Sequence, residues 1–129
     1  MSEVIPTSSF KKQFKKVKNN PRWKKIFNGS LPFSNKSSWD YVISSFLNDT
    51  ELPEYFYEHK ITLTKQVKKQ IKQRLKNKNI EVAGLDLHFD GHNGDHLLIY
   101  CRISEEKLVY LLAIGTHSEL FWISVNWYG

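Results

Sequence analysis

The chain has 129 residues, enough for one compact domain and too few for two, so we expect a single domain spanning residues 1–129. Hydrophobic residues make up 40% of the chain and charged residues 25%, a balance that excludes a largely disordered protein. The formal net charge of +6 indicates a polyanionic partner, because a basic surface gains affinity when phosphates replace condensed counterions.

The first half of the chain predicts two helices. Between Ser9 and Asn19, apolar residues recur at spacings of four and three, the period of a helix with one buried face. A similar stripe predicts a second helix from Ser38 to Asn48. The intervening stretch, 21–38, mixes Pro and Gly with aromatic residues and is expected to be a packed connection. The outer surface of the first helix is basic and carries Lys11, Lys12, Lys15 and Lys16.

A third helical pattern runs from Thr64 to Lys76. Val67, Ile71 and Leu75 recur every four residues, and basic residues surround this narrow apolar stripe. Two interpretations stay open at this point. The segment is either a solvent-exposed helix that packs along one edge or a basic surface that binds nucleic-acid phosphates.

The remainder of the chain predicts strands joined by short turns. The Asp90-Gly91 and Asn93-Gly94 pairs favour one antiparallel hairpin, and Ser104–Lys107 favours the next. Helices followed by hairpins predict an α+β fold of two layers, in which the N-terminal helical pair packs on a mostly antiparallel sheet of about four strands. The predicted strands are Val82–Phe89, His96–Ile103, Leu108–Gly115 and, as a fourth candidate, Phe121–Trp127.

The chain has neither a membrane segment nor a signal peptide by sequence. No run of about 18 apolar residues occurs, and the first ten residues lack the basic start and apolar core of a signal peptide. The single cysteine, Cys101, cannot form an internal disulfide. We therefore expect a soluble cytoplasmic protein with no membrane partner.

All the histidines lie in the second half, near the predicted strand ends: His59, His88, His92, His96 and His117. Neighbouring strand ends meet in an antiparallel sheet, so these side chains could converge on one edge. Imidazoles can act as base and acid at neutral pH, as RNA cleavage by its own 2′-hydroxyl requires without a metal ion. The alternative for each histidine is a partly exposed loop residue, and a metal site is the alternative for the cluster, although the spacing matches no zinc motif.

Three motifs in this order resemble the C-terminal half of YafQ-type toxins of the RelE/ParE superfamily. They are DLH at Asp86–His88, DHLLIY at Asp95–Tyr100 and GTHSELF at Gly115–Phe121. The resemblance implies the RelE-like fold, to which this chain adds an inserted basic helix. It also implies a toxin of a type II toxin-antitoxin system that cleaves mRNA on the 70S ribosome, leaves a cyclic phosphate, contacts ribosomal RNA, needs no cofactor and is silenced by a cognate antitoxin.

The resemblance also implies roles for individual residues. His117 would be the general acid, and His59 or His88, aided by Asp95, the base. Phe121 would stack on a nucleobase, while Asp86 matches a motif position without a settled role. The longer connection that holds the basic helix departs from the family and could move His59 away from the cleft.

Two further functions fit the same fold. The first is a non-catalytic ParE-like toxin or RNA-binding module, which would not need a convergent set of acids and bases. The second is a metal-dependent phosphoesterase, which would lose its activity in EDTA.

Overall fold

The computed structural model describes residues 1–76 and 82–123 and contains one five-stranded sheet with the order β1-β5-β4-β3-β2. The central strands are β3 (Gly84–His88), β4 (Leu97–Ile103) and β5 (Leu108–Gly115), which pair in antiparallel fashion. The short strand β2 (His59–Ile61) adds antiparallel to β3, and β1 (Glu3–Pro6) adds parallel to β5. The α+β class and the mostly antiparallel sheet are confirmed, with β1 and β2 as strands that the sequence did not predict.

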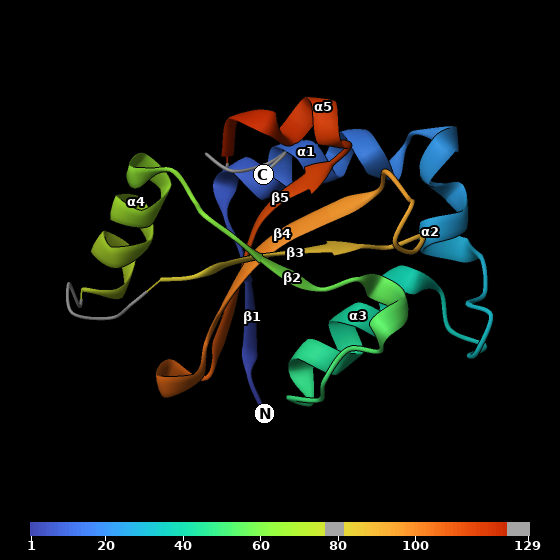
Figure 1. Cartoon of the computed structure of the whole chain (residues 1–129), viewed down its shortest axis with the longest axis horizontal. Helices are drawn as coiled ribbons and strands as arrows, with labels where there is room; N and C mark the ends of the chain where they lie inside the picture. Colours follow the sequence, from blue (N-terminus) through green and yellow to red (C-terminus); the bar gives the residue numbers. More distant parts are fainter. Residues whose placement is uncertain (77–81, 124–129) are drawn as a thin grey trace.

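Helices cover both faces of the sheet (Figure 1). On one face, α1 (Ser8–Lys18), α2 (Lys24–Asn28) and α3 (Ser38–Leu47) pack with the 3-10 helix η2 (Glu54–Phe56). The short 3-10 helix η1 (Pro21–Trp23) connects α1 to α2. On the other face lie α4 (Lys65–Leu75), α5 (His117–Leu120) and the 3-10 helix η4 (Phe121–Ile123). A further 3-10 turn, η3 (Ser104–Glu106), joins β4 to β5.

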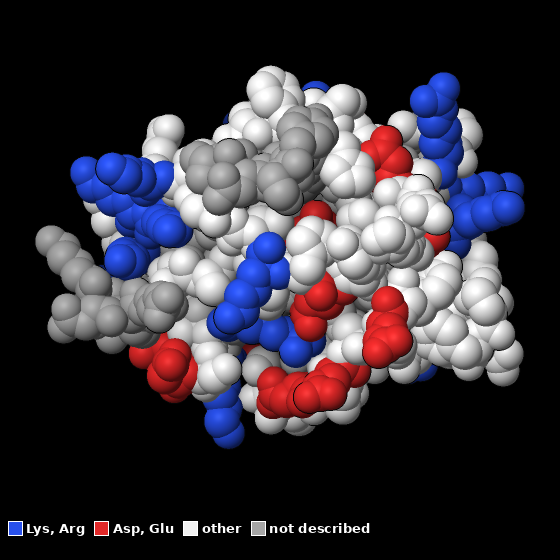
Figure 2. All heavy atoms as spheres, in the orientation of Figure 1, with Lys and Arg blue, Asp and Glu red and all other residues white. Residues whose placement is uncertain are grey.

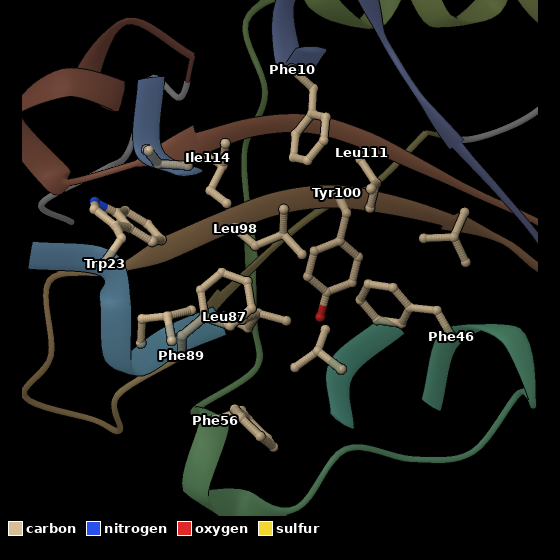
Figure 3. Packing of buried hydrophobic residues seen from close by; sticks show 14 of the residues in the cluster. Phe10, Trp23, Phe46, Phe56, Leu87, Phe89, Leu98, Tyr100, Leu111 and Ile114 are labelled. Atoms are coloured by element: carbon tan, nitrogen blue, oxygen red, sulfur yellow. The ribbon is translucent and has the colours of Figure 1, made fainter. Parts of the chain in front are cut away.

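The alternation of buried residues along β4 explains why two cores form. Leu98 and Tyr100 point into the core beneath α1 and α3, whereas Leu97, Ile99 and Cys101 point into the core beneath α4 and α5. Figure 3 shows the first of these cores, where the rings of Phe46 and Tyr100 lie 4.7 Å apart. Because both faces are buried, the central strands are almost continuously apolar.

The predicted helices agree with the structure to within one or two residues. Thr7, Ser37 and Thr64 each accept a hydrogen bond from a backbone N–H in the first turn of the helix that follows, which sets the start of α1, α3 and α4. The inserted basic helix is α4. No helix in the described ranges is both long and apolar enough to cross a membrane.

The fourth candidate strand, Phe121–Trp127, is wrong over residues 121–123, which form η4; residues 124–127 lie outside the described residues. The chain turns into a helix here because Thr116 and Glu119 form a capping box. The Thr116 side chain accepts from the N–H of Glu119, and the Glu119 carboxylate accepts from the N–H of Thr116.

Candidate active site

Residue pairing across the sheet brings the predicted site residues to one end. His59 on β2 lies directly opposite Asp86 on β3, and His88 follows Asp86 on the same face of that strand. His88 pairs with Leu97, which in turn pairs with Gly115. Asp95 lies two residues before Leu97 and His117 two residues after Gly115, so both lie beside His88.

The imidazole rings of His59, His88 and His117 form a continuous group. The ring centroids of His59 and His88 are 5.9 Å apart, and those of His88 and His117 are 5.3 Å apart. His88 is buried, whereas the side chains of His59 and His117 are about a third exposed. One edge of the cluster is therefore open to a substrate. The basic helix α4 leaves His59 in the cluster, because α4 begins only after β2 has paired with β3.

The same ring atom of each histidine is fixed by an acceptor. Nδ1 of His59 donates to the carbonyl of Tyr57 at 2.8 Å, and Nδ1 of His88 donates to the carbonyl of His92 at 3.0 Å. Nδ1 of His117 donates to Oδ1 of Asp95 at 2.6 Å. Carbonyl and carboxylate oxygens only accept, so each Nδ1 carries a proton. Nε2 is consequently the atom at which each ring can gain or lose a second proton.

Asp86 lies buried between two of these histidines. Its Oδ2 is 3.3 Å from Nε2 of His59 and 3.8 Å from Nε2 of His88, while Oδ1 has no hydrogen-bond partner among the described residues. Burial raises the pKa of the Asp86 carboxyl to about 7. At neutral pH this group can therefore hold a proton and exchange it with Nε2 of His59.

His88 is an uncharged imidazole in this setting. Burial lowers its pKa, and the nearby His117 acts in the same direction. The carbonyls of Gly91 and His92 oppose this shift without reversing it. Because Nδ1 carries the proton, Nε2 of the neutral ring carries a lone pair and can act as a base.

Asp95 orients His117, not His59 or His88. Its Oδ1 accepts both the ring Nδ1–H of His117 at 2.6 Å and the backbone N–H of the same residue at 2.8 Å. These two bonds fix the ring at the start of α5. The resemblance assigned Asp95 to the base. The structure instead places Asp95 beside His117, the residue expected to be the acid.

Tyr57 is a residue of the site that the sequence did not reveal. Its backbone is left-handed, with a φ of 50°, and its exposed ring has centroid distances of 4.7 Å to His59, 5.3 Å to His88 and 4.1 Å to His92. The Tyr57 carbonyl also orients His59. A tyrosine in a loop between unrelated motifs carries no signal in sequence that would predict this position.

The aromatic residue expected to stack on a nucleobase and the basic residues of α1 are all exposed. Phe121 is 62% exposed on η4, directly after α5. The lysines of α1 are exposed on its outer surface: Lys11, Lys12, Lys15 and Lys16. His92 lies exposed in the loop between β3 and β4, and His96 pairs with Asp90 outside the cluster.

His59, Asp86 and His88 are also the group in the described ranges that could hold a metal ion. One ligand atom from each lies within 4.8 Å of the others. Two imidazole nitrogens and one carboxylate suit a divalent transition metal, and the unpartnered Oδ1 of Asp86 adds an uncompensated acceptor. Asp90 and Asp95 are not part of this group.

Comparison with known proteins identifies the fold. No protein-family model and no curated protein matches the chain. Among solved structures, bacterial toxins match nearly the whole chain, which therefore has the fold of YafQ-type toxins. The Escherichia coli DinJ-YafQ complex matches with a TM-score of 0.56 at 20% identity, covering 94% of this chain and 99% of that one.

Toxins from Helicobacter pylori have the same fold. The structure described as a copper-bound mutant toxin has a TM-score of 0.54 at 23% identity, covering 94% of this chain and all of that one. A second, described as a metal-bound toxin, has a TM-score of 0.53 at 20% identity.

Proposed function

We propose that this protein is the toxin of a type II toxin-antitoxin system and cleaves mRNA on the 70S ribosome in the cytoplasm, within one domain spanning residues 1–129. The observation that carries the proposal is the convergence of His59, His88 and His117 from three different segments, each with Nδ1 fixed by an acceptor oxygen. A non-catalytic protein has no need for such a group.

In this proposal each residue has its own role in RNA cleavage. Nε2 of neutral His88 takes the proton of the 2′-hydroxyl, and the 2′-oxygen attacks phosphorus to form a 2′,3′-cyclic phosphate. As the bond from phosphorus to the 5′-oxygen breaks, Nε2 of protonated His117 donates a proton to that oxygen. Asp95 holds the His117 ring in place for this transfer. His59, which can take the proton of Asp86, supplies positive charge beside the phosphate.

The remaining predicted residues serve binding in this proposal. Phe121, exposed beside α5, stacks on a nucleobase, a contact worth about 1 to 3 kcal/mol. Lys11, Lys12, Lys15 and Lys16 contact phosphates of ribosomal RNA. Asp86 acts through His59, to which it can pass its proton.

A cleavage reaction on ribosomes tests the proposal. Purified protein added to translating 70S ribosomes with a defined mRNA should yield shorter messages that end in a 2′,3′-cyclic phosphate. His117→Ala should abolish the product. Lys107→Ala is the matched control, because Lys107 lies exposed in the turn at the opposite end of β4 and β5. An intact message in the presence of the unaltered protein would contradict the nuclease proposal.

The cognate antitoxin is the proposed protein partner. The neighbour of known structure is a complex of YafQ with DinJ, and we transfer to this chain the expectation of a protein that binds and silences it. An adjacent reading frame that encodes a small protein with a DNA-binding head would supply the candidate. Its co-expression should relieve growth arrest, and a lack of binding between the two purified proteins would contradict this pairing.

A non-catalytic toxin with the same fold makes a different prediction. If the protein blocks a target by binding alone, the double variant His88→Ala, His117→Ala should remain toxic at equal expression. The nuclease proposal predicts that this variant loses its toxicity.

A metal-dependent phosphoesterase is the second candidate, favoured by the geometry of His59, Asp86 and His88. A bound divalent ion would polarise the phosphate there. The same ion would occupy Nε2 of His88 and so prevent this nitrogen from acting as a base. EDTA should therefore leave the metal-free nuclease at least as active, whereas it should abolish a metal-dependent reaction.

A further inference from the structure

His96 lies outside the catalytic cluster and bridges two parts of the chain that are far apart in sequence. Its Nδ1 is 2.6 Å from Oδ2 of Asp90, and its Nε2 is 3.0 Å from the carbonyl oxygen of Arg22 in η1. The buried indole of Trp23 meets the imidazole edge to face, with ring centroids 4.6 Å apart. The ring is therefore held on three sides.

Both ring nitrogens of His96 face atoms that can only accept a hydrogen bond. The backbone carbonyl of Arg22 has no proton to offer. Burial acts to raise the pKa of Asp90, but the hydrogen bonds from the ring and backbone of His96, together with the charge of His96, lower that pKa overall, so Asp90 is a carboxylate. Two acceptors require two N–H donors, and an imidazole has two only when it is protonated.

The direction of the pKa shift of His96 supports a protonated ring. The hydrogen bond with Asp90 raises the pKa of His96 against the opposing effect of burial, and the charges of Asp90 and Asp95 add to the increase. These two aspartates are the charged groups facing the ring from the loop between β3 and β4. From η1 the ring meets the Arg22 carbonyl and the Trp23 indole, neither of which titrates.

The hydrogen bonds of His96 to Asp90 and to the Arg22 carbonyl form a bridge. This bridge fixes the loop whose atoms orient the catalytic histidines. Residues 89–96 supply the carbonyls of Gly91 and His92 that orient His88 and the carboxylate of Asp95 that orients His117. Oδ1 of Asp90 accepts the backbone N–H of His96 at 3.3 Å and closes the loop on itself. A Cβ at Gly94 would lie 1.9 Å from the same oxygen, so a larger residue there would displace the Asp90 carboxylate from His96.

We propose that protonated His96 is a positioning residue of the active site, whose positive charge ties the β3–β4 loop to η1 and thereby directs Asp95 at His117. When His96 loses its proton, one of its two bonds to Asp90 and to the Arg22 carbonyl must break. Since the bridge raises the pKa of His96, its contribution is complete below the ordinary histidine pKa of about 6.5, as long as Asp90 is ionised, and disappears as pH rises through that raised pKa. The catalytic consequence rests on the proposed nuclease function, whereas the charged bridge does not.

Nuclear magnetic resonance of the unaltered protein, labelled with ¹⁵N-histidine, tests the bridge without any nuclease assay. At pH 7 both ring nitrogens of His96 should carry protons, and the midpoint of its titration should lie above about 6.5, the ordinary value for histidine. The Nδ1 proton of His117 should shift or broaden at the same midpoint. A singly protonated His96 at pH 7 would overturn the proposal. So would a His117 Nδ1 proton signal that does not change while His96 titrates.

Two variants then connect the bridge to catalysis. His96→Phe keeps a ring against Trp23 but has no N–H, and it should slow single-turnover cleavage by about 10-fold or more while leaving ribosome affinity unchanged. His96→Arg keeps a permanent positive charge with donors in two directions, and it should retain most of the rate up to a higher pH than the unaltered protein.

Asn93→Ala, an exposed position of the same loop, is the control and should cleave normally. Cleavage by folded His96→Phe at the normal rate across the pH range would refute the positioning role. If the unaltered protein itself fails to cleave, the nuclease proposal fails while the titration still decides the bridge.

Discussion

The buried carboxyl of Asp86 makes the stability of the protein depend on pH. Its pKa is about 7 in the folded chain, against about 3.9 in an unfolded one. Between these values the folded state holds the extra proton, so the free energy of unfolding falls as pH rises, by up to about 4 kcal/mol. Asp86→Asn has the same shape and no charge. It should therefore be more stable than the unaltered protein at pH 8, by about 1 to 4 kcal/mol.

Urea denaturation at several pH values checks this expectation. The difference between Asp86→Asn and the unaltered protein should shrink as pH approaches 4, where both side chains are neutral. A difference that stays constant from pH 8 to pH 5 would show that the Asp86 carboxyl is not the cause.

The lowered pKa of His88 predicts the pH range in which cleavage slows on the acidic side. A base must be neutral, and His88 stays neutral below the usual midpoint of histidine, about pH 6.5, because burial disfavours its charge. The midpoint of the fall in single-turnover cleavage on the acidic side should therefore lie below about pH 6.5. An acid limb at pH 6.5 or higher, in protein shown to be folded at that pH, would assign the base to another group.

The sequence predicted which residues gather at the site better than it predicted how they pair. His59, His88, Asp95 and His117 follow from motifs whose strands must meet at one edge. That Asp95 bonds to His117 depends on the backbone path from β5 into α5, which no local pattern encodes. The same holds for His96, whose partner carbonyl at Arg22 lies 74 residues away.

The helices that carry an apolar stripe in their own sequence were predictable. The short strands that form only by pairing with an adjacent strand were not. The helices α1, α3 and α4 each carry an apolar stripe at helical spacing. β2 has three residues and β1 has four, and both exist because an adjacent strand pairs with them. The sequence did contain a signal against a strand at Phe121, because Thr116 and Glu119 have the spacing of a capping box, which begins a helix.

The contact between β3 and the segment leading to α4 is tight enough to test. A Cβ added at Gly84 would lie 2.6 Å from Cγ of Leu63, a side chain that is only 2% exposed. Gly84→Ala should lower the free energy of unfolding by about 1 to 3 kcal/mol, because Leu63 must move within a packed core. Ala83→Ser, at the exposed neighbouring position, should have little effect in the same urea titration. Equal stability of the two variants would mean that Leu63 adapts freely.

At the scale of the whole molecule, charge is unevenly distributed around the sheet. The face in Figure 2 carries basic side chains over α4, near α2 and at its centre, with acidic side chains in the region around the central ones. The acidic region would repel a phosphate backbone. The basic side chains away from this acidic region are therefore the candidates for a ribosome contact, in keeping with the net charge of +6.

Salt dependence can decide which basic surface meets the ribosome. If α1 contacts ribosomal RNA, the double variant Lys11→Gln, Lys15→Gln should weaken ribosome binding and reduce the slope of log affinity against log salt by about 1.5, since each lost phosphate contact removes about 0.7 to 0.9. The matched pair Lys65→Gln, Lys69→Gln on α4 removes the same charge from another exposed surface and should leave most of that slope unchanged. A large loss from the α4 pair with none from the α1 pair would move the ribosome contact to α4, because net charge is equal in the two variants and only its position differs.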